Sequence, residues 1–345
     1  MHGVGIIGCG LIGGKRAAAL EHFPDCHLEL AYDIDVGRTE AFVERYDCSP
    51  AQSPEEVFSN GKIDIVIVST VNKFSVPISV EALRVDKHVL CEKPPGRNLE
   101  EAKDLYQVAK QSKGKLKIGF NHRYHPAISR AKDLVDAGAI GEVFYIRSRY
   151  GHGGRPGYEK EWRGNVDLSG GGELIDQGIH ILDLFNWFMG DFSQVFGLTP
   201  TYVWKPDQGQ QPIGSTAWED NAFVLLKTVD GKVGSLHASC TQWKNLFSFE
   251  IFGREGYLLI EGLGGSYGVE TLKIGKRKKE GGPPNEEIIE FPGSDLSWKE
   301  EWREFVSAIN GNRNPLGDVH DGLKAMELVD AIYRSAKEGR VVNLL

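Results

Sequence analysis

A glycine-rich turn near the first residue constrains this chain more than any other feature. An apolar run at residues 4–7 leads into a turn with the spacing G-x-G-x-x-G, which consists of Gly8, Cys9, Gly10, Leu11, Ile12 and Gly13. With this spacing the first glycine permits a tight turn, the second lets backbone approach a pyrophosphate, and the third lets the next helix pack closely. N–H groups at the start of that helix then face the phosphates. The turn predicts a dinucleotide site, and a glycine-rich turn without a ligand is the alternative.

An acidic residue follows the second apolar run. Residues 28–32 read as a strand that ends at Asp33. Dinucleotide-binding units place a carboxylate about 20 residues beyond the glycines, where it accepts the hydroxyl groups of the adenine ribose. Because a carboxylate repels the 2′-phosphate of NADP, Asp33 favours NAD. Arg38 is the nearby cation that could favour NADP instead, so we expect NAD as the cofactor and treat NADP as the alternative.

Strands and helices alternate up to residue 121. We expect strands at residues 63–68, 88–91 and 116–120, and helices at residues 36–46, 76–83 and 99–110. This alternation predicts a doubly wound parallel sheet, whose ligands bind beyond the carboxyl ends of the strands. Polar residues at those ends complete the expected cofactor site, namely Ser69, Thr70, Asn72, Glu92 and Lys93. Residues 1–121 are therefore predicted to form a Rossmann dinucleotide-binding domain.

The pattern changes after residue 121. A helix is expected at residues 126–137, and period-two strands at residues 143–150, 195–203, 221–228, 232–240, 246–252 and 257–261. Such strands with hairpin signals predict an open, mostly antiparallel sheet with helices on one face. Two closing helices are expected at residues 298–309 and 323–337, and the basic run 276–279 is expected at a solvated hairpin tip. Residues 122–345 are thus predicted to form a second domain of the α/β type.

Three residues are candidates for catalysis. Asp176 and His180 are four residues apart in an apolar stretch that we predict to be helical, so their side chains would share one face. A carboxylate beside an imidazole can raise its basicity for proton transfer, and a polar pair on a helix surface is the alternative. Lys93 follows a strand and precedes two prolines, which would hold it at the crevice, although an ordinary surface lysine is also compatible. A metal site would need a third ligand that the sequence does not identify, so we expect none.

An irregular loop and its surroundings supply candidate substrate contacts. These are Asn121, Arg123, Tyr150, Arg155, Tyr158, Trp162 and Arg163, together with Lys93, Asp176 and His180. Aromatic faces suit sugar rings or a nucleobase, and guanidinium forks suit phosphates. An interdomain loop held by ordinary salt bridges is the alternative.

Three ordered motifs together resemble one known family. The glycine turn, the triplet Glu92-Lys93-Pro94, and Gly171-Gly172-x-x-x-Asp176-x-Gly178-x-His180 are similar to the glucose-fructose oxidoreductase and inositol dehydrogenase family (Gfo/Idh/MocA). The resemblance covers essentially the whole chain. It implies a Rossmann domain, a C-terminal domain whose open sheet is often used for oligomerisation, and hydride transfer between a nicotinamide and a sugar or cyclitol carbon.

The resemblance also implies roles for individual residues. Lys93 matches the family's motif lysine, and Asp176 and His180 match its catalytic pair. His180 would take the proton of a ring hydroxyl while Lys93 hydrogen-bonds the same oxygen, and Asp176 would orient the pair. One departure is visible, because residues 70–75 read Thr-Val-Asn-Lys-Phe-Ser where many members have Thr-Pro-Asn-x-x-His.

The substrate is expected to be a sugar. The string at residues 121–126, Asn-His-Arg-Tyr-His-Pro, looks similar to members that oxidise nucleotide-linked sugars at C3. We therefore expect an NAD-dependent dehydrogenase of a nucleotide sugar or glycoside, with an inositol or free-sugar dehydrogenase as the runner-up. A catalytically silent NAD-sensing regulator is an alternative from another class, and the intact Lys93, Asp176 and His180 argue against it. An enzyme that keeps its NAD bound and recycles it between two sugars is a further alternative.

Composition limits the partners and the compartment. The 345 residues carry a formal net charge of −8, which argues against nucleic acid as a partner. Five scattered cysteines without paired spacing argue against a disulfide framework and suit a reducing compartment. We expect no leader, because the glycine turn begins within ten residues of Met1, and no apolar stretch is long enough to span a bilayer, so a cytoplasmic protein without membrane attachment is expected. The family resemblance implies that residues 122–345 bind substrate and serve oligomerisation, so a homo-oligomer, dimer or tetramer, is expected as well.

Overall fold

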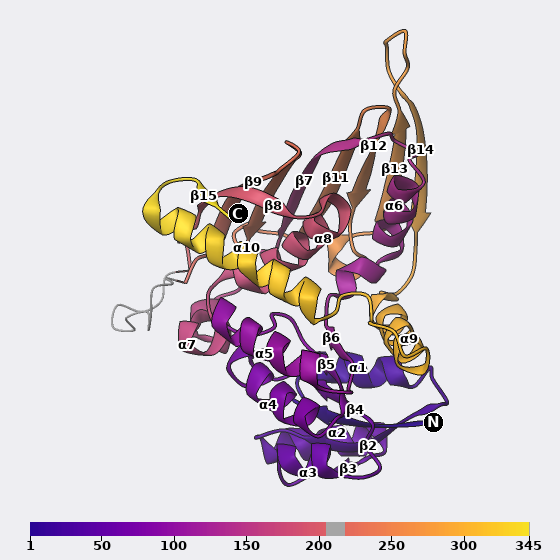
Figure 1. The fold of residues 1–345 in the computed structure, drawn as a ribbon, viewed down its shortest axis with the longest axis vertical. Helices are drawn as coiled ribbons and strands as arrows, with labels where there is room; N and C mark the ends of the chain where they lie inside the picture. The colour runs from indigo at the N-terminus through magenta and orange to yellow at the C-terminus, as the bar shows by residue number, and fades with distance from the viewer. Residues whose placement is uncertain (205–217, 345) are drawn as a thin grey trace. The chain divides into compact units, whose positions relative to one another are not determined.

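The computed structural model describes residues 1–204 and 218–344, which form two compact units. The first unit contains Met1–Asn121 and Trp298–Met326, and the second contains His122–Ser297 and Glu327–Leu345. Each unit therefore gathers two separate stretches of the chain (Figure 1). The predicted domain limits, 1–121 and 122–345, assign residues 298–326 differently, and those limits stay a prediction.

The first unit is built on a six-stranded parallel sheet with the order β3-β2-β1-β4-β5-β6. The strands are β1 (His2–Ile7), β2 (Cys26–Tyr32), β3 (Ser49–Pro50), β4 (Ile65–Val68), β5 (His88–Cys91) and β6 (Leu116–Ile118). The helices are α1 (Leu11–Leu20), α2 (Val36–Tyr46), α3 (Pro54–Ser59), α4 (Asn72–Arg84), α5 (Leu99–Gln111) and α9 (Ser297–Asn310). This confirms the predicted doubly wound sheet, and only the two-residue β3 was missed.

Local sequence explains where these elements begin and what they bury. The four residues of β4 are all buried, as expected for a central parallel strand. Ser53 caps α3 by accepting a hydrogen bond from the N–H of Glu56 at 3.3 Å, which fixes where this helix begins. On α9, Trp302 and Phe305 pack into the same core as Val4 of β1. A helix from the far end of the chain thereby becomes part of the first unit.

The second unit contains a nine-stranded sheet with the order β14-β13-β12-β11-β7-β10-β9-β8-β15. Its strands are β7 (Val143–Gly151), β8 (Phe192–Leu198), β9 (Asn221–Thr228), β10 (Val233–Ser239), β11 (Leu246–Gly253), β12 (Gly256–Glu261), β13 (Glu270–Lys276), β14 (Asn285–Phe291) and β15 (Val342–Asn343). All neighbours are antiparallel except β7 and β10, which pair in parallel. The predicted mostly antiparallel sheet is confirmed.

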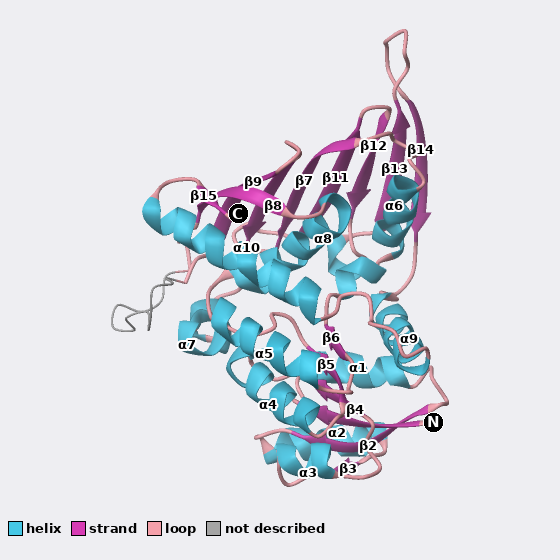
Figure 2. Ribbon diagram, in the orientation of Figure 1, coloured by secondary structure: helices cyan, strands magenta, loops and turns pink. Residues whose placement is uncertain are grey.

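Helices cover one face of this sheet (Figure 2). They are α6 (Pro126–Asp136), α8 (Ile179–Met189) and the second half of α10 (Val319–Glu338), where Ile332 packs against Gly197 of β8. On the other face apolar side chains of two neighbouring strands stay exposed, namely Leu198 of β8 and Phe223 and Leu225 of β9. The sheet therefore has one open face, as predicted.

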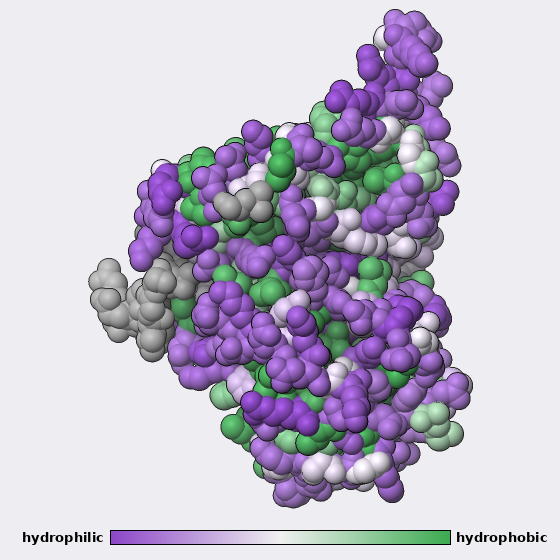
Figure 3. Space-filling view, viewed as in Figure 1, coloured by the Kyte–Doolittle hydropathy of each residue, from purple (hydrophilic) through white to green (hydrophobic). Residues whose placement is uncertain are grey.

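Three strands of this sheet were missed by sequence reasoning, and one was misplaced. β13, β14 and the two-residue β15 lie beyond the last predicted strand, and β8 begins at Phe192 and ends at Leu198 rather than spanning residues 195–203. The basic run 276–279 does lie at the turn between β13 and β14, which Figure 3 shows as hydrophilic. Among the described residues, no helix is both long and apolar enough to cross a membrane.

Candidate active site

The glycine turn is shaped by steric contacts that only glycine allows. Gly8 ends β1 with φ +104°, and a Cβ atom there would lie 2.5 Å from the carbonyl oxygen of Ser69. The Ser69 hydroxyl donates a hydrogen bond to the carbonyl oxygen of Gly8 at 2.8 Å. A Cβ atom on Gly13 would lie 2.1 Å from that same Gly8 oxygen. The turn, α1 and the end of β4 are therefore in direct contact.

Gly10 behaves differently, and its surroundings fit a dinucleotide. Gly10 is the N-cap of α1, and a Cβ atom added there would meet no atom within 4 Å. No side chain of the described residues caps the first turn of α1. Backbone N–H groups at a helix start beside open space form a ready anion site. The turn that sequence reasoning singled out thus has the room and the donors that a pyrophosphate needs.

Asp33 lies beside this turn at the end of β2. Its Oδ2 accepts a hydrogen bond from the N–H of Cys9 at 2.8 Å, and its Oδ1 accepts one from the N–H of Asp35 at 3.0 Å. Burial, together with the Asp33 carboxylate, raises the pKa of the Cys9 thiol to about 12. Arg38 points its guanidinium at Asp35, with 3.3 Å between Nε and Oδ2. The cation expected to favour NADP therefore already has a carboxylate beside it.

Apolar side chains flank the same carboxylate. Ile34 and Val36 follow Asp33, and both are exposed, as is Leu11 in the turn itself. Exposed apolar side chains beside a ribose site suit a flat ring such as adenine. Ile34 and Val36 were not among the predicted site residues, although two apolar residues next to a polar strand end are a visible signal.

The remaining cofactor candidates lie at the ends of β4 and β5. Thr70 donates its hydroxyl hydrogen bond to the carbonyl oxygen of Val71 at 3.2 Å, and Asn72 is buried as the first residue of α4. The Glu92 carboxylate accepts a hydrogen bond from Nε of Arg16 at 2.6 Å, so it is held inside the unit. Lys93 follows directly and is partly exposed.

In the second unit, the predicted helix around Asp176 is interrupted. Residues Leu174–Gly178 form a π-helical turn, η4, and α8 begins only at Ile179. Asp176 and His180 therefore do not share one regular α-helix as the i, i+4 spacing predicted, because a π turn changes the angular offset between them. The Asp176 carboxylate accepts a hydrogen bond from Nε of Arg163 at 3.0 Å. Insertions of this kind are frequent at functional sites.

His180 lies in a cluster of rings. It is 5% exposed, and its imidazole stacks on that of His122 with 3.8 Å between ring centroids and 23° between planes. The Tyr150 ring meets the His122 ring edge-on at 5.1 Å. Burial raises the pKa of Tyr150 well above its ordinary value, so that phenol stays protonated at neutral pH. His122 was not a predicted site residue, although it belongs to the string at residues 121–126.

The loop after β7 holds its charged groups in pairs. Arg155 donates two hydrogen bonds to Glu161, both at 2.7 Å, while Arg163 is bound to Asp176 and lies over the Trp162 ring at 4.5 Å. Arg155 and Arg163, the two arginines of this loop that were predicted to contact substrate, therefore already bind carboxylates.

Buried acids support this loop, and sequence reasoning missed them. The buried Glu173 carboxylate accepts a hydrogen bond from the Tyr158 hydroxyl at 3.1 Å and lies 3.5 Å from Nε2 of His152. Burial opposes protonation of His152, but the Glu173 carboxylate outweighs it and raises the His152 pKa. Burial also raises the pKa of the Glu219 carboxyl to about 8. Their signal was weak, because a single acid in an apolar stretch does not show that it is buried.

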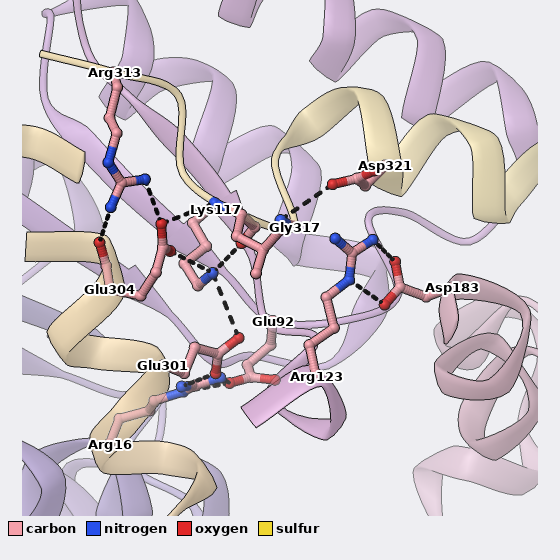
Figure 4. A network of polar contacts seen from close by, with 11 residues as sticks. Arg16, Glu92, Lys117, Arg123, Asp183, Glu301, Glu304, Arg313, Gly317 and Asp321 are labelled. Carbon is pink, nitrogen blue, oxygen red and sulfur yellow. Dashed lines mark hydrogen bonds and ion pairs between the residues drawn. The ribbon is translucent and has the colours of Figure 1, made fainter. Parts of the chain in front are cut away.

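Arg123 is bound within the protein. Its guanidinium forms a bidentate pair with Asp183 of α8, at 2.8 Å from Nε and 2.5 Å from Nη2 (Figure 4). Both side chains are 1% exposed, and the neighbouring Asn121 is also buried. Within residues 1–204 and 218–344, no group of three or more His, Cys, Asp or Glu side chains is placed to hold a metal ion.

Comparison with known proteins gives two matching domain families and several relatives. The NAD-binding Rossmann fold of an oxidoreductase family matches residues 2–120, and the C-terminal alpha/beta domain of the same family matches residues 132–344. Levoglucosan dehydrogenase of Pseudarthrobacter phenanthrenivorans is 28% identical over 84% of this chain and 82% of its own length. D-glucoside 3-dehydrogenase of Escherichia coli is 26% identical over 99% of this chain and 97% of its own length. The structure of a levoglucosan dehydrogenase in complex with NADH matches 100% of this chain and 99% of its own length, at 22% identity. The TM-score of 0.90 shows that the two proteins share a fold.

Proposed function

Because the chain belongs to the Gfo/Idh/MocA oxidoreductase family, we propose that it oxidises a secondary ring hydroxyl of a neutral sugar or cyclitol. It is an NAD-dependent oxidoreductase acting on CH–OH groups. The sugar class, the carbon and the roles of individual residues are parts of the proposal. C3 of a pyranose ring is the proposed carbon, supported by the relative named as a D-glucoside 3-dehydrogenase.

The pairing of Arg155 with Glu161 and of Arg163 with Asp176 carries the proposal of a neutral substrate. An anionic phosphate is bound best by guanidinium groups that are not already neutralised by carboxylates. A nucleotide sugar would have to displace one of these acids, whereas a neutral ring can use them as hydrogen-bond acceptors. The net charge of −8 also gives no general attraction for anions.

The proposed chemistry assigns a separate role to each candidate residue. Backbone N–H groups around Gly10 would hold the pyrophosphate, and Asp33 would accept the ribose hydroxyls. Bound NAD supplies the hydride acceptor. Lys93 donates a hydrogen bond to the reacting hydroxyl oxygen, a ring nitrogen of His180 takes the hydroxyl proton, and Asp176 orients the pair. A positioned base of this kind typically contributes about 10²- to 10⁴-fold to the rate.

The test is NADH formation by the purified protein with NAD and a substrate panel. The panel contains levoglucosan, a methyl glucoside, myo-inositol, free glucose and UDP-glucose. We expect turnover on a neutral ring and a loss of about 10²-fold or more in His180→Ala, with NAD binding retained. Turnover on UDP-glucose alone would contradict the neutral class and favour the nucleotide sugar. NAD binding without any turnover would favour the silent regulator.

We further propose that the protein works as a homo-oligomer through the open face of the nine-stranded sheet. The face carries exposed apolar side chains on two neighbouring strands, Leu198 on β8 and Phe223 and Leu225 on β9. Exposed apolar groups that continue across a sheet are typical of protein–protein interfaces. A second copy of the chain is the partner that a self-complementary sheet face fits best.

A further inference from the structure

A chain of buried charges of alternating sign runs through the first unit (Figure 4). We call it the charge chain, and its members in order are Glu92, Arg16, Glu301, Lys117, Glu304 and Arg313. Glu92 is at one end, next to Lys93 in sequence. Arg313 is at the other end and is exposed. The proposed function uses none of the middle members.

Arg16 is the central fork of the charge chain. It lies on α1 and is 1% exposed. Its Nε donates to Oε1 of Glu92 at 2.6 Å, and its Nη1 donates to Oε2 of Glu301 on α9 at 2.5 Å. A planar guanidinium can hold two carboxylates in fixed directions at once, which an ammonium group does less well.

Lys117 extends the charge chain on β6. Its Nζ lies 4.0 Å from Oε1 of Glu301 and 3.2 Å from Oε2 of Glu304, and it also donates to the carbonyl oxygen of Leu316. Glu304 accepts a hydrogen bond from Nη1 of Arg313 at 2.6 Å. Despite its burial, the Glu304 carboxyl has a lowered pKa because Lys117 and Arg313 stabilise its charged form.

Positive and negative charges balance within the charge chain, and its side chains are closely packed. Each buried charge has an opposite charge beside it, which buried ions require. No side chain fits at Gly119, because a Cβ atom there would lie 2.7 Å from Oε2 of Glu92 and 2.8 Å from Nη2 of Arg16. The pair of Glu92 and Arg16 is therefore closely packed against the backbone at Gly119.

We propose that Arg16 and Glu301 are positioning residues for Lys93. The N–H of Glu92 donates to the carbonyl oxygen of Val68 at 2.9 Å, and its side chain is held by Arg16. The residue before Lys93 is thus fixed on both its backbone and its side chain. This inference rests on the proposed function in one respect, which is that Lys93 meets the substrate oxygen.

Arg16 connects the helix of the expected pyrophosphate site to the residue that precedes Lys93. Arg16 lies on the same helix, α1, whose first turn would hold the pyrophosphate, and it also holds Glu92. A shift of α1 is therefore transmitted to the backbone from which Lys93 extends. Glu301 anchors Arg16 from α9, so a helix remote in sequence contributes to the site without touching any ligand.

The variant that tests this is Glu301→Gln. It leaves two complete buried pairs, Arg16 with Glu92 and Lys117 with Glu304, so the fold is expected to persist. It removes the charge that ties Arg16 to α9. Glu300→Gln is the matched control, because Glu300 is the preceding residue of the same helix and pairs on the surface with Arg303.

The experiment measures the reactivity of Lys93 without any substrate. Wild type and both variants are reductively methylated with formaldehyde and borohydride, and the labelling rate of Lys93 relative to the exposed Lys113 is read by peptide mass spectrometry. We expect a change of about threefold or more in Glu301→Gln and none in Glu300→Gln, with NAD affinity retained because backbone groups hold the phosphates. An unchanged relative rate in Glu301→Gln overturns the proposal.

A second readout separates positioning from structural damage. With a sugar that turns over, we expect kcat of Glu301→Gln to fall by about tenfold or more while KM and NAD affinity stay close to wild type. A fall in NAD affinity together with kcat would indicate general damage to the unit and overturn the positioning role. The labelling result stands whether or not any sugar is turned over, so failure of the proposed function is recognised separately.

Discussion

Asp33 illustrates how one side chain can serve both the fold and the cofactor. Its carboxylate accepts hydrogen bonds from the N–H groups of Cys9 and Asp35, so it holds the glycine turn against the end of β2. The same charge would repel a 2′-phosphate. We therefore predict that cofactor choice depends on the same side chain as the geometry of the turn.

Replacing Asp33 with Asn should relax the preference for NAD. Asn retains an acceptor oxygen for the Cys9 N–H but loses the charge, so we expect the ratio of kcat/KM for NAD to that for NADP to fall by about tenfold or more. Steady-state kinetics with both cofactors measure this ratio. Asp86→Asn, at a turn far along the sequence, is the control that should leave it unchanged. An unaltered ratio in Asp33→Asn would show that the carboxylate does not select the cofactor.

Glu219 should make stability depend on pH in an unusual direction. Burial raises its pKa from 4.5 to about 8, although the N–H of Leu174 and the Tyr333 hydroxyl donate to it. Between these values the folded state keeps a proton that the unfolded state has lost, so rising pH lowers the free energy of unfolding. Below pH 4.5 this loss of unfolding free energy is absent, and above pH 8 it is complete.

Glu219→Gln removes this titration. We expect its free energy of unfolding relative to wild type to rise by a few kcal/mol between about pH 5 and about pH 8, at up to about 1.4 kcal/mol per pH unit. A hydrogen bond lost in the variant shifts every pH value equally and does not alter this slope. Thermal unfolding of both proteins across the pH range measures it, and parallel curves would mean that Glu219 is ionised when folded.

Individual site residues could be predicted where the local sequence indicates their role, but the side chains that they contact could not. Asp33 was identified from its position after a strand. The pairs Arg163–Asp176 and His122–His180 join residues 13 and 58 positions apart, and no local spacing indicates them. Such contacts depend on tertiary packing, which one sequence does not reveal.

At the scale of elements, the glycine turn offers a matched pair of substitutions. Gly13→Ala places a Cβ atom 2.1 Å from the Gly8 carbonyl oxygen, whereas Gly10→Ala places one in open space. We expect Gly13→Ala to lower the melting temperature and weaken NAD binding together. Gly10→Ala should keep the wild-type melting temperature and still lose about tenfold or more in NAD affinity, because its methyl group meets the pyrophosphate.

Thermal unfolding and NADH fluorescence titration separate the two effects. If Gly10→Ala bound NAD as well as wild type does, the pyrophosphate would not approach this backbone. If Gly13→Ala were as stable as wild type, the contact between α1 and the end of β1 would be looser than the structure indicates.

Elements with strong periodicity were predicted well, and weakly patterned ones were not. β9 was predicted with its observed limits because exposed and buried residues alternate along it. β14 is almost wholly exposed and rich in Glu, so it has no apolar alternation to detect. The π turn at Leu174–Gly178 was missed because hydrophobic spacing does not distinguish it from an α-helical turn over so few residues.

At the scale of the whole molecule, the course of the chain was the least predictable feature. Residues 298–326 return to the first unit, where Glu301 and Trp302 become buried. An amphipathic helix pattern shows that α9 has a buried face but not which sheet it covers. The sheet type of each unit, doubly wound and parallel in the first and mostly antiparallel in the second, was predictable because alternating and period-two patterns determine it directly.

The open face of the nine-stranded sheet leads to a prediction about assembly. Leu225 on β9 is 53% exposed, and it lies beside Phe223 of the same strand and opposite Phe196 of β8. If a second copy covers the face, Leu225→Glu places a charge in a buried interface without an opposite charge, which opposes association. We expect wild type to have the mass of a dimer or tetramer and the variant to shift toward the monomer.

Size-exclusion chromatography with light scattering measures these masses at matched concentrations. Val85→Glu is the control, since Val85 is 50% exposed in the first unit and lies outside the sheet face. A monomeric wild type would contradict the proposed assembly. An oligomer that Leu225→Glu leaves intact would place the interface on another surface, and the exposed apolar residues of the sheet would then require a different partner. Because the helices cover only one face, burial of the other by a second copy is the outcome that accounts for both faces of the sheet.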